Sequence, residues 1–105
     1  HKEEMSIILL TVDGQRETDR TLSAGSEHIA TFSYRLSSNA KMEMIGEMHT
    51  DEAGYVPVED ISLEQTDNGI TAKFGRGLRA GTYRITFSID ANNTDDNVYF
   101  LFIIE

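Results

Sequence analysis

The segment Met42–His49 carries the soft metal ligands of this sequence, with methionine thioethers at Met42, Met44 and Met48 beside the imidazole of His49. Thioether sulfur and imidazole nitrogen suit Cu(I), so Met44, Met48 and His49 are candidate ligands of a periplasmic copper carrier. In a strand, however, alternation places the three methionines on one face and His49 on the other. Because methionine on an inward face fills a core, core packing is the alternative interpretation.

The segment Asp90–Asn97 is the richest in hard oxygen ligands, which Ca²⁺ prefers. Three of its residues occupy alternate ligand positions of a calcium loop: Asp90, Asn92 and Thr94. Asp95 stands where an EF-hand requires glycine, and Leu101 where it requires a bidentate glutamate. A solvated hairpin loop is the alternative, because Asp and Asn favour turns. Asn92-Asn93-Thr94 also forms a glycosylation sequon. We therefore assign no metal ligand and no cofactor.

The histidines His1, His28 and His49 stand apart from any nucleophile at a recognisable spacing. No nucleophile elbow is present, and the absence of cysteine excludes a thiolate nucleophile or metal site. We expect nothing to pair with these histidines and expect no catalytic residues, because a sandwich this small rarely encloses a pocket.

One basic stretch interrupts the acidic chain, with no Asp or Glu between Asp67 and Asp90. Its cations are Lys73, Arg76, Arg79 and Arg84. Such a cluster could dock an acidic neighbour. The alternative is a solvated corner, with charges offset by the acids of the Asp51-Glu52 loop at the same end of the fold, since exposed ion pairs contribute little.

The elements that position these groups are strands, because apolar and polar residues alternate and turn residues recur at strand spacing. We predict seven: Met5–Val12, Ile29–Leu36, Lys41–His49, Ile61–Leu63, Ile70–Phe74, Tyr83–Ile89 and Val98–Glu105. We interpret Thr50–Pro57, with the single proline, as a surface loop. Residues 1–105 are expected to form one all-β domain, an antiparallel sandwich with inward side chains such as Ala30 and Phe32.

The last predicted strand is apolar on both faces. Val98, Phe100, Phe102 and Ile104 alternate with Tyr99, Leu101 and Ile103. A second apolar face indicates burial under something. We expect cover from within the chain; the alternative is burial against another subunit, as in a phage or appendage structural protein.

The sequence from Leu78 to Tyr83 leads a tight turn into a strand whose inward residues are Tyr83, Ile85, Phe87 and Ile89. A tyrosine at the strand entrance resembles the tyrosine corner of immunoglobulin-like sandwiches, in which the hydroxyl bonds backbone a few residues upstream. Together with the apolar final strand, Leu78–Glu105 resembles the closing hairpin of bacterial immunoglobulin-like surface modules. The resemblance implies an immunoglobulin-like sandwich of about seven strands, extracellular, cell-surface or periplasmic, that serves as a spacer, adhesion or ligand-binding unit. The absence of Cys and Trp excludes the antibody subclass.

The net charge of the chain argues against two classes of partner, nucleic acid and anionic membranes. Nine Lys and Arg against eighteen Asp and Glu give a net charge of −9, which repels nucleic acid and anionic lipid. The apolar runs Ile7–Leu10 and Val98–Ile104 are too short to span a bilayer. A chain that opens at His1 is expected to be a processed secreted chain or an excised segment with flanking domains. We therefore predict a non-enzymatic binding or spacer module whose partner is a protein or a glycan; a copper carrier and a structural subunit remain the alternatives.

Overall fold

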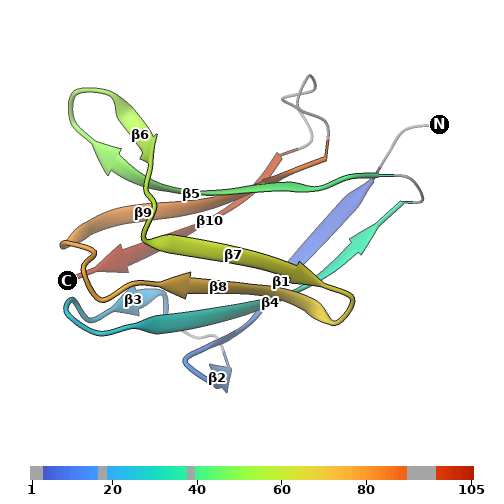
Figure 1. Ribbon diagram of the computed structural model, residues 1–105, viewed down its shortest axis with the longest axis horizontal. Helices are drawn as coiled ribbons and strands as arrows, with labels where there is room; N and C mark the ends of the chain where they lie inside the picture. Colours follow the sequence, from blue (N-terminus) through green and yellow to red (C-terminus); the bar gives the residue numbers. More distant parts are fainter. Residues whose placement is uncertain (1–3, 17–18, 38–39, 90–96) are drawn as a thin grey trace.

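The computed structural model describes residues 4–16, 19–37, 40–89 and 97–105, and it arranges them in two stacked sheets (Figure 1). The first sheet has the order β2-β1-β4-β8-β7. Its strands are β1 (Met5–Val12), β2 (Gln15–Arg16), β4 (His28–Leu36), β7 (Ile61–Thr66) and β8 (Gly69–Phe74). The second sheet has the order β3-β10-β9-β5-β6. Its strands are β3 (Thr21–Leu22), β5 (Glu43–Thr50), β6 (Gly54–Pro57), β9 (Gly81–Ser88) and β10 (Asn97–Ile104).

These sheets confirm the prediction of an all-β sandwich. Among the described strands, every pair is antiparallel except β3 with β10, and none of the described residues forms a helix. The predicted closing hairpin is present as β9 and β10, which pair without a register shift from Asn97 opposite Ser88 to Ile104 opposite Gly81.

The described residues form ten strands rather than about seven, because β2, β3 and β6 are too short to show alternation. The interpretation of Thr50–Pro57 as a loop throughout is wrong, since its second half is β6 and pairs with β5. A tight turn makes this pairing reachable: Gly54 adopts a φ of 68°, and the Thr50 hydroxyl donates to the Gly54 carbonyl and accepts from the Ala53 N–H.

The core lies between the sheets and is held by aromatic rings from both of them. Phe32 on β4 packs against Phe87 on β9 and Phe100 on β10, with ring centroids 5.2 and 5.1 Å apart. Phe74 on β8 meets Phe102 on β10 at 5.0 Å. Edge-on and tilted contacts at this distance are favourable beyond the area they bury. The inward faces predicted from alternation therefore meet as expected.

Tyr83 confirms the predicted corner. Its side chain is fully buried, and its hydroxyl donates to the carbonyl of Arg79, four residues upstream, at 2.6 Å. Burial raises the pKa of the Tyr83 phenol, although the nearby charge of Arg79 opposes the shift. The phenol therefore stays protonated and keeps donating at neutral pH.

Candidate functional site

The Met42–His49 segment does not bring its soft ligands together. Met42 is buried, and Met44 and Met48 pack against the core between the sheets. His49 lies on the opposite face of β5, where its ring meets Tyr55 edge-on at 5.1 Å. Core packing, the alternative interpretation, is thus what the methionines do.

The candidate calcium segment and the sequon fall at residues 90–96, outside the described residues, and Asn97 begins β10. Among the residues that are described, no group of three or more His, Cys, Asp and Glu side chains could hold a metal ion.

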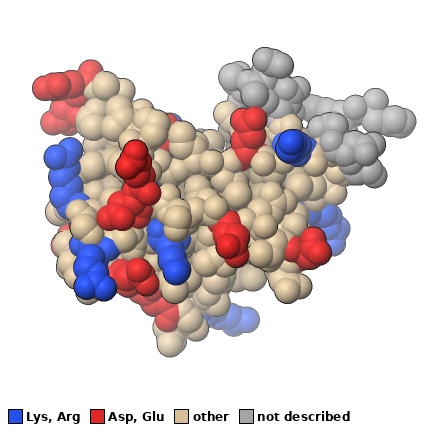
Figure 2. Space-filling model, in the orientation of Figure 1, with Lys and Arg blue, Asp and Glu red and all other residues tan. Residues whose placement is uncertain are grey.

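The basic stretch is dispersed over the fold. Lys73 lies on β8 of the first sheet, whereas Arg84 lies on β9 of the second. Arg79 lines an open hollow together with Asp51 and Glu52, so the acids of that loop do lie at the same end as the corner before Tyr83. Figure 2 shows acidic and basic side chains interspersed over one face of the molecule. The structure therefore gathers no cationic docking patch from these four residues.

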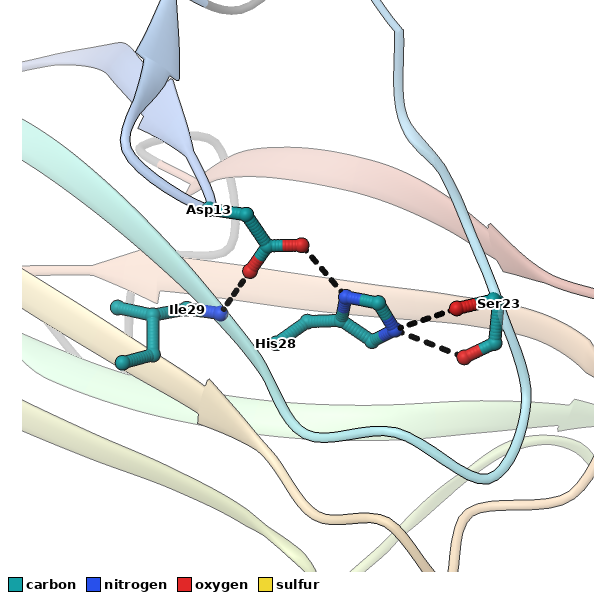
Figure 3. Close-up of polar contacts among 4 residues, drawn as sticks. All are labelled: Asp13, Ser23, His28 and Ile29. Atoms are coloured by element: carbon teal, nitrogen blue, oxygen red, sulfur yellow. Dashed lines mark hydrogen bonds and ion pairs between the residues drawn. The ribbon is translucent and has the colours of Figure 1, made fainter.

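His28 corrects the expectation that the histidines have no partners. Its side chain is 9% exposed, and its Nδ1 lies 2.6 Å from an Asp13 carboxylate oxygen (Figure 3). On its other side, Nε2 lies 2.7 Å from the Ser23 carbonyl oxygen and 3.4 Å from the Ser23 hydroxyl. Asp13 is fixed by Ile29, whose N–H donates to its second carboxylate oxygen. His28 thus ties the β1–β2 turn and the segment after β3 to the start of β4.

A local rule explains how Asp13 reaches this position. The two-residue turn between β1 and β2 has positive φ at both Asp13 and Gly14, as a type I′ hairpin turn requires. Asp tolerates that conformation better than most residues. Alternation along the strand could have identified His28 as buried, because it lies two residues before Ala30 on the inward face of β4. A histidine on that face needs a polar partner.

Asp13, His28 and Ser23 have the residue types of a catalytic triad without its chemistry. The Ser23 carbonyl carries no proton, so Nε2 must donate to it, and Nδ1 donates to the carboxylate. An imidazole that donates from both nitrogens has no lone pair with which to take a proton from a hydroxyl. When both nitrogens carry protons, His28 is a cation held between two acceptors.

The same cluster predicts a pH dependence of stability. Burial disfavours the charged form of His28, but the hydrogen bonds to Asp13 and Ser23 outweigh burial and raise its pKa. Burial likewise opposes ionisation of Asp13, but the bonds from His28 and Ile29 lower its pKa. A raised histidine pKa stabilises the fold below about pH 6.5 and loses that contribution as pH rises through the folded value. Because the pKa of Asp13 is lowered in the folded state, its carboxylate stabilises the fold above about pH 3.8. That contribution is lost as pH falls through the lower folded value.

We therefore expect the wild-type free energy of unfolding to fall between about pH 5.5 and 8.5 by about 1 kcal/mol more than that of Asp13→Asn. Asparagine keeps the turn and an acceptor for Ile29 but removes the charge that holds the imidazolium. The figure is low because the Asp13 side chain is 45% exposed. Urea unfolding of both proteins at the two pH values measures this difference. An equal fall in the free energy of unfolding for wild type and Asp13→Asn would contradict the prediction.

The outward side of β10 also corrects an expectation, because nothing within the described chain covers it. Tyr99, Leu101 and Ile103 are 59%, 42% and 46% exposed. The ladder places Tyr99 beside Thr86 of β9 and Thr86 beside Ile45 of β5, which is also exposed. We call this surface the outer face, made by seven residues: Ile45, Glu47, Tyr55, Arg84, Tyr99, Leu101 and Ile103.

Arg84 occupies the centre of the outer face. Its Nε and one terminal nitrogen donate to a single Glu47 oxygen at 3.2 and 2.9 Å. Its guanidinium lies 3.8 Å from the Tyr55 ring centroid and 5.7 Å from that of Tyr99. Both charges are mostly buried, which strengthens their attraction and fixes the guanidinium between the two rings.

The outer face combines tyrosine and arginine with exposed aliphatic side chains. Tyrosine, arginine and exposed aliphatic side chains are the groups enriched at the centres of protein interfaces. Arg84 and Glu47 neutralise each other's charge, so a partner can cover the pair without leaving a lone buried charge. The alternation in Val98–Glu105 pointed to this face, but Arg84, Tyr55 and Glu47 could not be placed on it without the strand pairing.

None of the described residues forms a helix long and apolar enough to cross a membrane. No protein-family model matches the sequence, and no curated protein proves similar to it.

Proposed function

We propose that this chain is a non-enzymatic, immunoglobulin-like binding module of a secreted or cell-surface bacterial protein, and that it engages a protein partner through the outer face. The observation that carries the proposal is the exposed row of Tyr99, Leu101 and Ile103 on β10, with Arg84 held beside it on β9 and Ile45 exposed one strand further on β5. Contiguous apolar surface of this kind on a small domain marks an interaction site.

Topology supports the immunoglobulin-like part of the proposal. The run β1-β4-β8-β7 has the strand order A-B-E-D of such folds, and β10-β9-β5 has the order G-F-C. The hydrogen bond from Tyr83 to Arg79 has the form of a tyrosine corner. An extracellular, cell-surface or periplasmic location is proposed from the same likeness.

A protein partner is favoured over a glycan, because the outer face exposes three aliphatic side chains, those of Ile45, Leu101 and Ile103. A spacer role is compatible with binding: β1 begins near one end of the long axis and β10 ends near the other (Figure 1). Modules with that geometry can be joined in a line.

The test compares three immobilised proteins: wild type, Ile45→Lys and Ile8→Lys. Both substitutions place a lysine on an exposed strand isoleucine, but Ile8 lies on β1 of the first sheet. We expect a protein of the source organism's cell envelope to be retained by wild type and Ile8→Lys and lost, by about tenfold or more, with Ile45→Lys. Equal retention by all three, or by none, would contradict the proposal.

The exposed side of β10 also favours a second candidate, a structural subunit of an appendage or phage in which β10 is buried against another subunit. Subunits of that kind add head to tail into open polymers. Sedimentation that shows mass growing without limit as concentration rises would support this candidate, and a mass that stops at a small closed species would exclude it.

A further inference from the structure

Among the described residues, no strand covers most of one edge of β10. Within the described part of the chain, β9 pairs with all eight residues of β10 on one side, whereas β3 covers only Ile103 and Ile104 on the other. The stretch Asn97–Phe102 therefore has a strand neighbour on one side only. Its unpaired N–H and C=O groups are a template for another strand.

Hydrogen bonds between β10 and the residues around β3 show which residues of β10 direct their backbone N–H and C=O groups toward the open edge. The Ile103 N–H donates to Arg20 and the Glu105 N–H donates to Leu22, so odd-numbered residues of β10 point their backbone groups away from β9. The pairing with β9 has no bulge, so this parity continues back along the strand. The N–H and C=O groups of Tyr99 and Leu101 thus lie in the sheet plane at the open edge.

The β10 edge lacks the features that usually prevent pairing. Asn97–Ile103 contains no charged residue, proline or glycine in a chain in which 26% of residues are charged. The open edges of β1, β6 and β7 each carry such a feature: β1 has a register irregularity between Leu9 and Thr11, β6 ends in Pro57, and β7 carries Glu64. Bulges, prolines and charges are the devices by which proteins block edge pairing.

We propose that two copies of this chain pair through their β10 edges, antiparallel and about a two-fold axis. A second copy fits because an antiparallel edge is self-complementary, and because this edge is neutral on a protein of net charge −9. Tyr99 of each copy then lies opposite Tyr99 of the other and Asn97 lies opposite Leu101, because pairing Tyr99 with Leu101 would place Asn97 of one copy where β3 already lies beside Ile103 of the other. Each such pair is a hydrogen-bonded one, since both residues turn N–H and C=O toward the partner.

The pairing goes beyond the proposed function and does not rest on it. It joins the second sheets of the two copies into one continuous sheet, and it leaves Ile45 and Tyr55 free on the joined outer faces. Tyr99 and Leu101 belong to both surfaces, whereas Ile45 belongs to the outer face alone, so Ile45→Lys distinguishes a failure of partner binding from a failure of self-association.

The test is sedimentation equilibrium from about 1 µM to about 1 mM, with two substitutions at Leu101. Leu101→Pro and Leu101→Ala both remove the leucine side chain, but only proline removes the outward N–H, and neither disturbs the bonds to β9. We expect a monomer–dimer equilibrium in the wild type, and a dissociation constant at least about tenfold higher for Leu101→Pro than for Leu101→Ala.

Circular dichroism and the melting temperature show whether Leu101→Pro disturbs folding. If it does, three lysine variants still test the dimer. Tyr99→Lys should weaken the dimer, because a lysine at the edge places two charges across the two-fold axis. Ile45→Lys and Ile8→Lys should leave it unchanged. A monomer at every concentration would overturn the inference, as would a dimer indifferent to Tyr99→Lys or a dimer lost with Ile45→Lys, which would indicate face-to-face docking.

Discussion

Phe32→Ala is expected to lower the free energy of unfolding by about 3–5 kcal/mol, the range for truncating a buried phenylalanine. Phe32 is 1% exposed, and its ring reaches from β4 across to Phe87 and Phe100 in the second sheet. Alanine would leave a cavity between the sheets, because strands fixed by their ladders cannot close on it. A cysteine-free domain of this size, with no disulfide to limit the unfolded state, has about 5–15 kcal/mol in total to lose.

Urea unfolding followed by far-ultraviolet circular dichroism measures this loss. Phe32→Leu keeps most of the volume and should lose only about 1–1.5 kcal/mol. Ile8→Ala, at a side chain 58% exposed, should change the value by less than about 0.5 kcal/mol. Similar losses for Phe32→Ala and Ile8→Ala would mean that the inner faces of the two sheets do not meet at Phe32.

The long strands were predictable because their inward residues alternate over six or more positions. Met5–Val12 was predicted with the bounds the structure gives, and the inward placement of Phe32 and Phe87 followed from parity alone. Strands of two residues, such as β2 and β3, carry no such signal. They form because a turn or a neighbouring edge offers hydrogen bonds, which is tertiary information.

The contacts of His28 could not be predicted either, because they also depend on strand pairing. Asp13 and His28 are fifteen residues apart and meet only because β1 and β4 pair antiparallel. The predicted strand began at Ile29, one residue late, which hid the inward position of His28. For β10, alternation revealed a second apolar face, but whether other parts of the chain cover it depends on the edges and lengths of distant strands.

Gly69→Ala is the second substitution with a large expected effect, a loss of about 2–5 kcal/mol from two independent causes. Gly69 closes the β7–β8 hairpin at a φ of 148°, which L residues rarely adopt. A β-carbon built there would also lie 2.6 Å from the carbonyl oxygen of Phe32. That oxygen belongs to the backbone of β4, next to β8 in the first sheet, so it cannot rotate aside as a side chain would.

Gly25→Ala separates the two causes. Gly25 has a φ of 84°, but a β-carbon there would meet no atom within 4 Å, so alanine brings only the backbone penalty of about 1–2 kcal/mol. Gly69→Ala should therefore lose at least about 1 kcal/mol more than Gly25→Ala in the same urea titration. Equal losses would attribute the whole effect to dihedral strain and would mean that β4 can move away from the hairpin. Since the Phe32 carbonyl belongs to the residue that joins the two sheets, such movement would also reduce the loss expected for Phe32→Ala.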